Sequence, residues 1–97
     1  MAFIQIIEMR TKSPDELQAL GEEFFAATEG KRTVRRSIVT RDRNDPERHV
    51  LIVFFDSYES AMENSNLPET AQFAEKQMAL LDGPPSFADL DIIEDRT

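Results

Sequence analysis

The only histidine in the chain, His49, is the first of five polar residues that could do chemistry. It stands at the start of an apolar run. Imidazoles exchange protons near neutral pH, so His49 could act as a general base. It follows a turn, however, lies near the cations Arg41 and Arg48, and has no carboxylate partner that spacing can assign. The competing interpretation is a strand-end histidine on the surface.

Arg35 is the second candidate, because a guanidinium on a half-buried strand could bind a carboxylate or phenolate. The expected strand pairing places it beside Phe55. Its structural alternative is an ion pair with an acid of a second subunit. Seven of the eleven basic residues fall within 31–48 beside three acids, which leaves this segment at +4 and the remainder at −12. Such a segment is either a solvated strand edge or an anion-attracting rim.

Three further candidates share one predicted helix. Asn66 follows Tyr58 and Met62 at intervals of four residues and ends the helix. Its amide could therefore face a cavity and hydrogen-bond a carbonyl or phenol, or it could cap the next helix, which begins at Pro68. Asn64 is expected to be solvated, and Tyr58 to pack its ring on the sheet edge with its hydroxyl exposed.

Composition argues against several other kinds of site. The chain has no cysteine and one histidine, which excludes a disulfide, a thiolate nucleophile, a cysteine-based metal site and a multi-histidine metal centre. No Ser/His/Asp grouping, phosphate-binding loop or dinucleotide fingerprint is present. A net charge of −8 argues against nucleic-acid or anionic-membrane binding. With no secretory signal or membrane-spanning run, we expect a cytoplasmic protein without a metal or cofactor.

The element that must position these residues is a strand over 48–56. Its core, residues 50–55, is six consecutive apolar residues, mostly β-branched or aromatic, and both of its faces are therefore apolar. Turn residues at 43–47 join it to a polar edge strand over 33–42, in a register where partner numbers sum to 90. Further strands are expected over 2–9 and 87–94.

Capping and spacing predict the helices. Ser13, Pro14 and Glu16 form a capping box that starts a helix running to about residue 28, with Gly21 in its middle. A close approach to the sheet would explain that glycine. Ser57 should cap the second helical region, which breaks before Pro68. Beyond the break, the inward stripe is expected to be Ala74, Met78 and Leu81, flanked by Phe73.

The resulting order, β-α-β-β-α-β, predicts an α+β ferredoxin-like fold over the single domain 1–97. Its four-stranded antiparallel sheet should have the order 4-1-3-2, with the helices on one face. The strands over 2–9 and 48–56 are nonetheless apolar on both faces. Each large apolar side chain left in water forfeits about 1.5 to 3 kcal/mol. We therefore expect a homodimer formed through the helix-free sheet face.

This topology, with F-D-S-Y-E-S-A-M-E-N-S-N-L-P-E-T at 55–70 and D-G-P-P-S-F-A-D-L-D at 82–91, resembles the dimeric α/β-barrel superfamily. Within it, the chain is most similar to small proteins grouped with the antibiotic biosynthesis monooxygenases. The resemblance implies a homodimer whose two sheets form a barrel. It also implies a small-molecule pocket, for an apolar or aromatic ligand, between each sheet and its helices.

Several activities occur in that superfamily, including cofactor-free oxygenation of polycyclic phenols, haem degradation and muconolactone-type isomerisation. The haem-degrading signature, a tryptophan with a histidine in the second helical region, is absent here, and the oxygenase tryptophan is also missing. Asn64, Asn66 and Tyr58 lie in the stretch comparable to the polar residues of the oxygenases. The resemblance thus implies a cofactor-independent monooxygenase acting on an aromatic or polyketide-like substrate. The alternative is a non-enzymatic ligand-binding or accessory protein.

Overall fold

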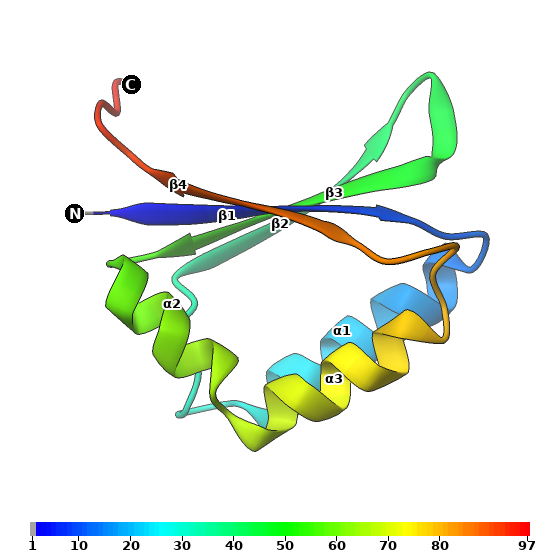
Figure 1. The fold of residues 1–97 in the computed structure, drawn as a ribbon, viewed down its shortest axis with the longest axis horizontal. Coiled ribbons are helices and arrows are strands. Elements are labelled where there is room, and N and C mark those ends of the chain that lie inside the picture. Colours follow the sequence, from blue (N-terminus) through cyan, green and yellow to red (C-terminus); the bar gives the residue numbers. More distant parts are fainter. Residues whose placement is uncertain (1) are drawn as a thin grey trace.

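The helices lie on one face of a four-stranded antiparallel sheet in the computed structural model, which describes residues 2–97 (Figure 1). The order of strands across the sheet is β2-β3-β1-β4, as the sequence predicts. The fold is therefore α+β and ferredoxin-like. Its elements are β1 (Phe3–Arg10), α1 (Pro14–Ala27), β2 (Arg36–Asp42), β3 (Asp45–Phe55), α2 (Tyr58–Ser65), α3 (Pro68–Met78) and β4 (Ser86–Asp91).

The pairing of β2 with β3 confirms the predicted register except at the turn. Arg41 lies opposite His49, as expected, but a register shift then places Asp42 opposite Asp45. The turn is shorter than expected, and β3 begins three residues before the predicted start. The Asp42 carboxylate explains the tight turn, since its Oδ1 accepts a hydrogen bond of 2.8 Å from the backbone N–H of Asn44.

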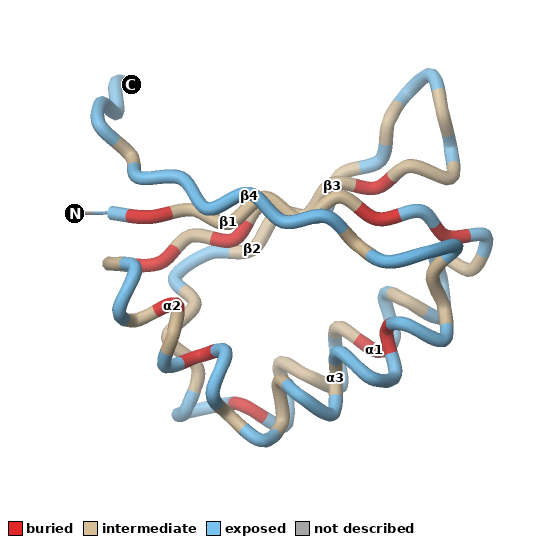
Figure 2. Tube along the Cα trace, in the orientation of Figure 1, coloured by how far each residue is buried: buried red, intermediate tan, exposed pale blue. Residues whose placement is uncertain are grey.

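The two faces of the sheet have different surroundings. On the helix side, Phe3, Val53 and Phe55 pack with Ala61 of α2 in a buried core. The opposite face carries half-buried apolar side chains, and no helix within residues 2–97 covers it (Figure 2). These side chains are Ile4, Ile6, Ile38, Val50, Ile52 and Phe54.

The start of α1 is built differently from the prediction. The side chain of Ser13 makes no capping hydrogen bond, so the expected capping box with Glu16 is wrong. Instead, Thr11 Oγ1 accepts from the N–H of Ser13 at 3.0 Å and donates to the carbonyl of Leu80 at 2.7 Å. Thr11 thereby connects β1, the start of α1 and the end of α3.

The inward faces of α2 and α3 are also rotated relative to the prediction. Gln77 is buried, whereas Met78 is 47% exposed. In α2 the buried residues are Ala61 and Asn64, and Asn66 is exposed. The inward faces include the polar residues Asn64 and Gln77, so a stripe of apolar residues could not define which side of either helix faces inward.

A pair of serine substitutions tests the capping assignments. The Ser57 side chain accepts from the Ser60 N–H at 3.1 Å in a complete capping box. We expect Ser57→Ala to lower the free energy of unfolding by about 1 kcal/mol, the usual effect of losing an N-cap. Ser13→Ala is the matched control and should cost clearly less. Urea unfolding followed by circular dichroism measures both, and equal losses would contradict the assignment.

Candidate functional site

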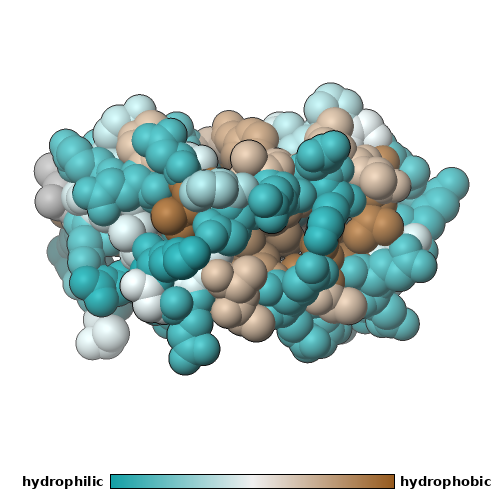
Figure 3. All heavy atoms as spheres, turned by 90° about the horizontal axis from the view of Figure 1, so that it is seen from below, coloured by the Kyte–Doolittle hydropathy of each residue, from teal (hydrophilic) through white to brown (hydrophobic). Residues whose placement is uncertain are grey.

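A cavity of about 1280 Å³ lies between the helices and the hairpin end of the sheet. Its apolar wall includes Met9, Leu17, Phe25, Val39, Leu51 and Phe73. Its polar groups include Gln18, Arg41, His49 and Gln77. Seen from the helix side, hydrophilic side chains surround apolar ones that lie deeper (Figure 3). The combination of an apolar wall and a few polar groups is typical of small-molecule sites.

The cavity forms beside a helix pair that is held together and tied to the sheet at one end. The rings of Phe24 in α1 and Phe73 in α3 pack 4.8 Å apart between centroids, and Lys76 donates to Glu23 at 3.1 Å. After α3, the backbone N–H of Asp82 donates to the carbonyl of Arg10 at 2.8 Å. The helices therefore pack on each other, while the floor formed by Leu51 and Val39 stays accessible.

His49 lies on the wall of this cavity and is only 5% exposed, so its expected place on the surface is wrong. It sits on the helix side of β3, between Met9 of β1 and Arg41 of β2. Its Nδ1 is 3.2 Å from the carbonyl oxygen of Glu47. A carbonyl can only accept, so Nδ1 is the donor in this contact.

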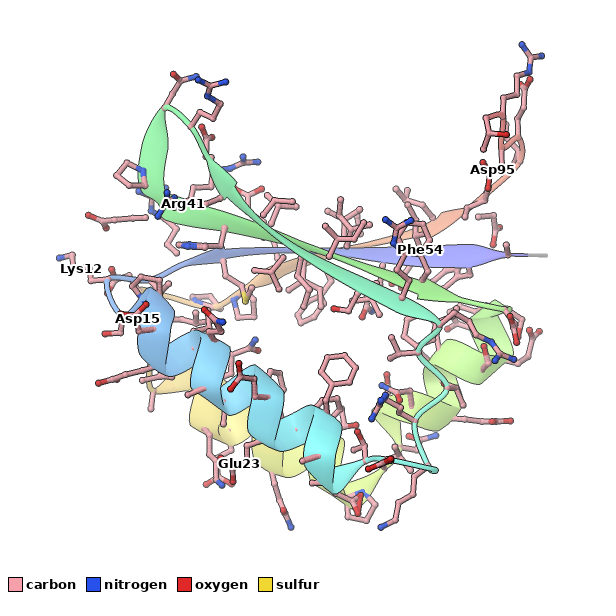
Figure 4. The ribbon with its side chains drawn as sticks, turned by 180° about the vertical axis from the view of Figure 1, so that it is seen from behind. Lys12, Asp15, Glu23, Arg41, Phe54 and Asp95 are labelled. Atoms are coloured by element: carbon pink, nitrogen blue, oxygen red, sulfur yellow. The ribbon has the colours of Figure 1, made fainter. Side chains whose placement is uncertain are left out.

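Arg41 supplies a cation at the hairpin end of the cavity. Figure 4 shows it above the first turn of α1, which carries Asp15, and both residues line the cavity. Across residues 2–97, no ion pair within 4 Å involves Arg41 or Arg43. Both guanidinium groups are therefore free of ion pairs, and the carboxylates of Asp15, Glu22 and Asp42 line the same cavity.

The other hairpin cations are occupied by carboxylates. Arg10 holds Asp45 through bonds of 2.8 and 3.2 Å, and Arg48 holds Glu8 at 3.0 Å and Asp42 at 3.2 Å. The hydrogen bonds from Arg48 lower the pKa of Glu8, and those from Arg10 lower the pKa of Asp45. This network fixes the hairpin that carries Arg41 and His49.

The remaining predicted site residues do not line the cavity. Asn64 is 8% exposed, so its expected solvation is wrong. Its Oδ1 accepts from the backbone N–H of Thr33 at 3.2 Å, and its carbonyl accepts from Thr70 Oγ1 at 2.6 Å. Asn64 thereby attaches the segment before β2 to the junction between α2 and α3.

Asn66, Tyr58 and Arg35 lie in the part of the molecule near α2. Asn66 is the exposed C-cap of α2, and Leu67 is the N-cap of α3, so both interpretations of Asn66 are wrong. Tyr58 is 48% exposed and packs edge-on against Phe3 at 5.5 Å between centroids, which agrees with the structural expectation. Arg35 Nε donates to Asp56 of the same chain at 2.9 Å. The acid that pairs with Arg35 is therefore in its own subunit.

Sequence reasoning missed Gln77, Gln18 and the position of Gly21. Gln77 is 6% exposed, and its Nε2 lies 3.2 Å from the sulfur of Met9. It follows Phe73 by four residues, so both lie on one face of α3. The spacing of four residues from Phe73 could have placed Gln77 on the inward face. Because glutamine is polar, its residue type offered no reason to expect it there.

Two kinds of feature are absent from residues 2–97. There is no group of three or more histidine, aspartate or glutamate side chains that could hold a metal ion. In the same part of the chain, no helix is both long enough and apolar enough to cross a membrane.

Solved structures share this fold over nearly the whole chain, although neither a family model nor a curated protein matches the sequence. Many of these structures are antibiotic biosynthesis monooxygenase-like proteins, and the chain has their ferredoxin-like fold. At identities below 25%, the similarity shows the fold alone.

Three of the matching structures show how similar the folds are at low sequence identity. SnoaB, a cofactor-independent oxygenase from Streptomyces nogalater, is 13% identical with a TM-score of 0.83, over 97% of this chain and 95% of SnoaB. A proposed antibiotic biosynthesis monooxygenase from Chloroflexus aurantiacus is 18% identical with a TM-score of 0.77, covering 100% and 98%. A Mycobacterium tuberculosis protein is 15% identical with a TM-score of 0.81, covering 100% of both chains.

The ion pairs of the hairpin predict how stability responds to acid. The pKa values of Glu8 and Asp45 are lower in the folded protein than their ordinary values of about 4, so the folded state binds fewer protons than the unfolded state near that pH. The stabilisation is complete above the ordinary pKa and is lost as pH falls through the depressed one.

We therefore expect the urea midpoint of the native protein to fall between pH 5 and about 2.5, and to fall less in a Glu8→Gln/Asp45→Asn variant. Glu75→Gln, at an exposed position of α3 outside the hairpin, is the control and should follow the native curve. Parallel curves for the native protein and the double variant would contradict the role of these pairs.

Proposed function

We propose that the cavity binds a planar aromatic molecule and that the protein acts as a cofactor-independent monooxygenase on it. One observation carries this proposal: a cavity with a largely apolar wall is lined by a buried imidazole whose Nδ1 contacts a backbone carbonyl. The fold shared with SnoaB, a cofactor-independent oxygenase, supports the same reaction class. Arg41 supplies the positive charge that an anionic substrate requires.

The proposed reaction uses the substrate as the source of electrons. His49 Nε2 removes a proton from a phenol, or from a methylene group between aromatic rings, and Arg41 stabilises the resulting anion. The anion gives its electrons to molecular oxygen, and the methylene becomes a carbonyl as one water leaves. One molecule of O₂ thus supplies the oxygen atom of the carbonyl and that of the water, and it accepts the four electrons that the methylene carbon loses. The apolar walls orient the rings.

Binding without turnover is the second candidate function, and the surroundings of His49 favour it. The partner of Nδ1 is a backbone carbonyl, which orients the ring but carries no full negative charge to stabilise an imidazolium. In addition, Asn64, Asn66 and Tyr58 lie outside the cavity. A ligand-binding or accessory protein would need the apolar cavity and Arg41 but not a strong base.

We also propose that two copies pack through their helix-free sheet faces. Ile6 and Ile38 flank Ile52 across three strands, and Leu90 of β4, opposite Ile4, is 46% exposed. This continuous apolar face lacks a covering helix and has the character of an interface. A twofold pair of the same chain would cover both copies of the face at once.

The role of His49 can be tested with dithranol, a three-ring phenolic anthrone. We expect the native protein to consume oxygen with dithranol above the rate of the buffer, and His49→Gln to slow this by about 100-fold, the lower range of general-base effects. The dissociation constant of the His49→Gln variant for dithranol should differ less than threefold from that of the native protein. An oxygen electrode and equilibrium dialysis give the two values.

Arg35→Gln, outside the cavity, is the control for that experiment and should behave as the native protein does. Undiminished oxygen uptake in His49→Gln would exclude the base. Binding of dithranol by the native protein without any oxygen uptake would select the non-enzymatic function.

Sedimentation tests the proposed dimer. At micromolar concentrations the native protein should sediment with about twice the chain mass of 11.1 kDa. Ile52→Asp should shift it to the monomer, because a carboxylate buried in the interface would lack a partner. Ala71→Asp, on an exposed position of α3, controls for the added charge and should remain dimeric. A native protein that sediments as a monomer at 50 μM or above would overturn the proposal, whether or not the Ile52 variant folds.

A further inference from the structure

Gly21 lies in the middle of α1, where glycine is an unfavourable choice. Its backbone freedom is lost when the helix forms, so alanine at an interior position gives a more stable helix. The structure shows no compensation at this position. A Cβ built on Gly21 would meet no other group within 4 Å, and the residue does not have a positive φ angle. The expected close approach to the sheet is therefore wrong.

The surroundings of Gly21 point to the cavity instead. Gly21 lines it, as do Leu17 and Gln18 on the preceding turn and Phe25 on the following turn. These residues are spaced by three or four positions, so they lie on one face of the helix. Between Leu17 and Phe25, a length of about 12 Å of helix, the wall at Gly21 is bare backbone.

We propose that Gly21 determines which ligands fit the cavity, because its bare backbone lets the flat face of a fused ring system lie against α1. This inference deepens the proposed function and rests on it. The ligand class is a planar molecule of three or more fused rings with phenolic or keto groups along one edge. That edge lies toward His49 and Arg41 at the hairpin end, and the apolar face lies between α1 and the floor at Leu51.

A smaller ligand needs the bare wall less. A two-ring molecule can sit against Leu51 and the apolar wall without spanning the helix from Leu17 to Phe25. A side chain at position 21 should therefore discriminate by ligand size. Alanine adds a single methyl group into open space, whereas leucine extends farther from the wall across the cavity.

The test compares two substitutions at position 21 and two probes, naphthol with two rings and dithranol with three. We expect Gly21→Ala to raise the thermal midpoint by about 4 °C, because it removes the glycine penalty without a clash. We expect Gly21→Leu to remain folded. Its dissociation constant for dithranol should rise at least tenfold, while its dissociation constant for naphthol should change less than threefold. Dissociation constants come from equilibrium dialysis, and circular dichroism reports folding.

Ala19→Leu is the matched control, since it adds the same bulk at an exposed position of α1 that does not line the cavity. It should leave both affinities within twofold of the native values. Val39→Asp places a charge on the exposed part of the cavity floor and should weaken the binding of both probes. That result would locate binding in the cavity.

The outcomes separate this inference from the proposed function. A lower thermal midpoint for Gly21→Ala would show that the glycine has a structural role, and the inference would be wrong. Unchanged dithranol affinity in Gly21→Leu, with binding lost in Val39→Asp, would also overturn it while leaving the proposed function intact. Failure of the native protein to bind either probe would overturn both.

Discussion

The constraint on which the structure depends is that both faces of β3 are apolar. Alternation along a strand sends Leu51, Val53 and Phe55 to one side and Val50, Ile52 and Phe54 to the other. On the first side, α2 packs over Val53 and Phe55 and forms the buried core. Leu51, farther along, packs against the edge of this core and also lines the cavity. One strand therefore contributes to a packed core, to a binding surface and to an uncovered apolar face.

Much of the fold could be predicted from residues alone, because its signals are local. The apolar run over 50–55, the turn chemistry before it and the break before Pro68 are enough to give the order of elements and the strand register. The face of the sheet that carries the helices could not be predicted, since both faces of β3 are equally apolar. The burial of His49 depends on that choice, and the turn and the cations Arg41 and Arg48 beside it are equally typical of a surface histidine.

The candidate site was less predictable than the fold because it is a space and not a motif. Its existence depends on how far the α1–α3 pair stands from the sheet, which is set by contacts between distant segments such as Thr11 with Leu80. The expectation for Asn66 failed because α2 buries Ala61 and Asn64, and not the stripe of Tyr58, Met62 and Asn66. Gly21 was visible in the sequence, but one glycine is compatible with close packing and with open space.

The two proposed surfaces are not independent, because they share β3. His49 and Leu51 face the cavity, while their neighbours Val50 and Ile52 face the uncovered side. A partner packed against Val50 and Ile52 would restrict movement of the same strand that positions His49. A ligand against Leu51 and His49 would restrict it from the other side. Because β3 pairs along its length with β1 and β2, a substitution that displaces the strand would disturb both surfaces together.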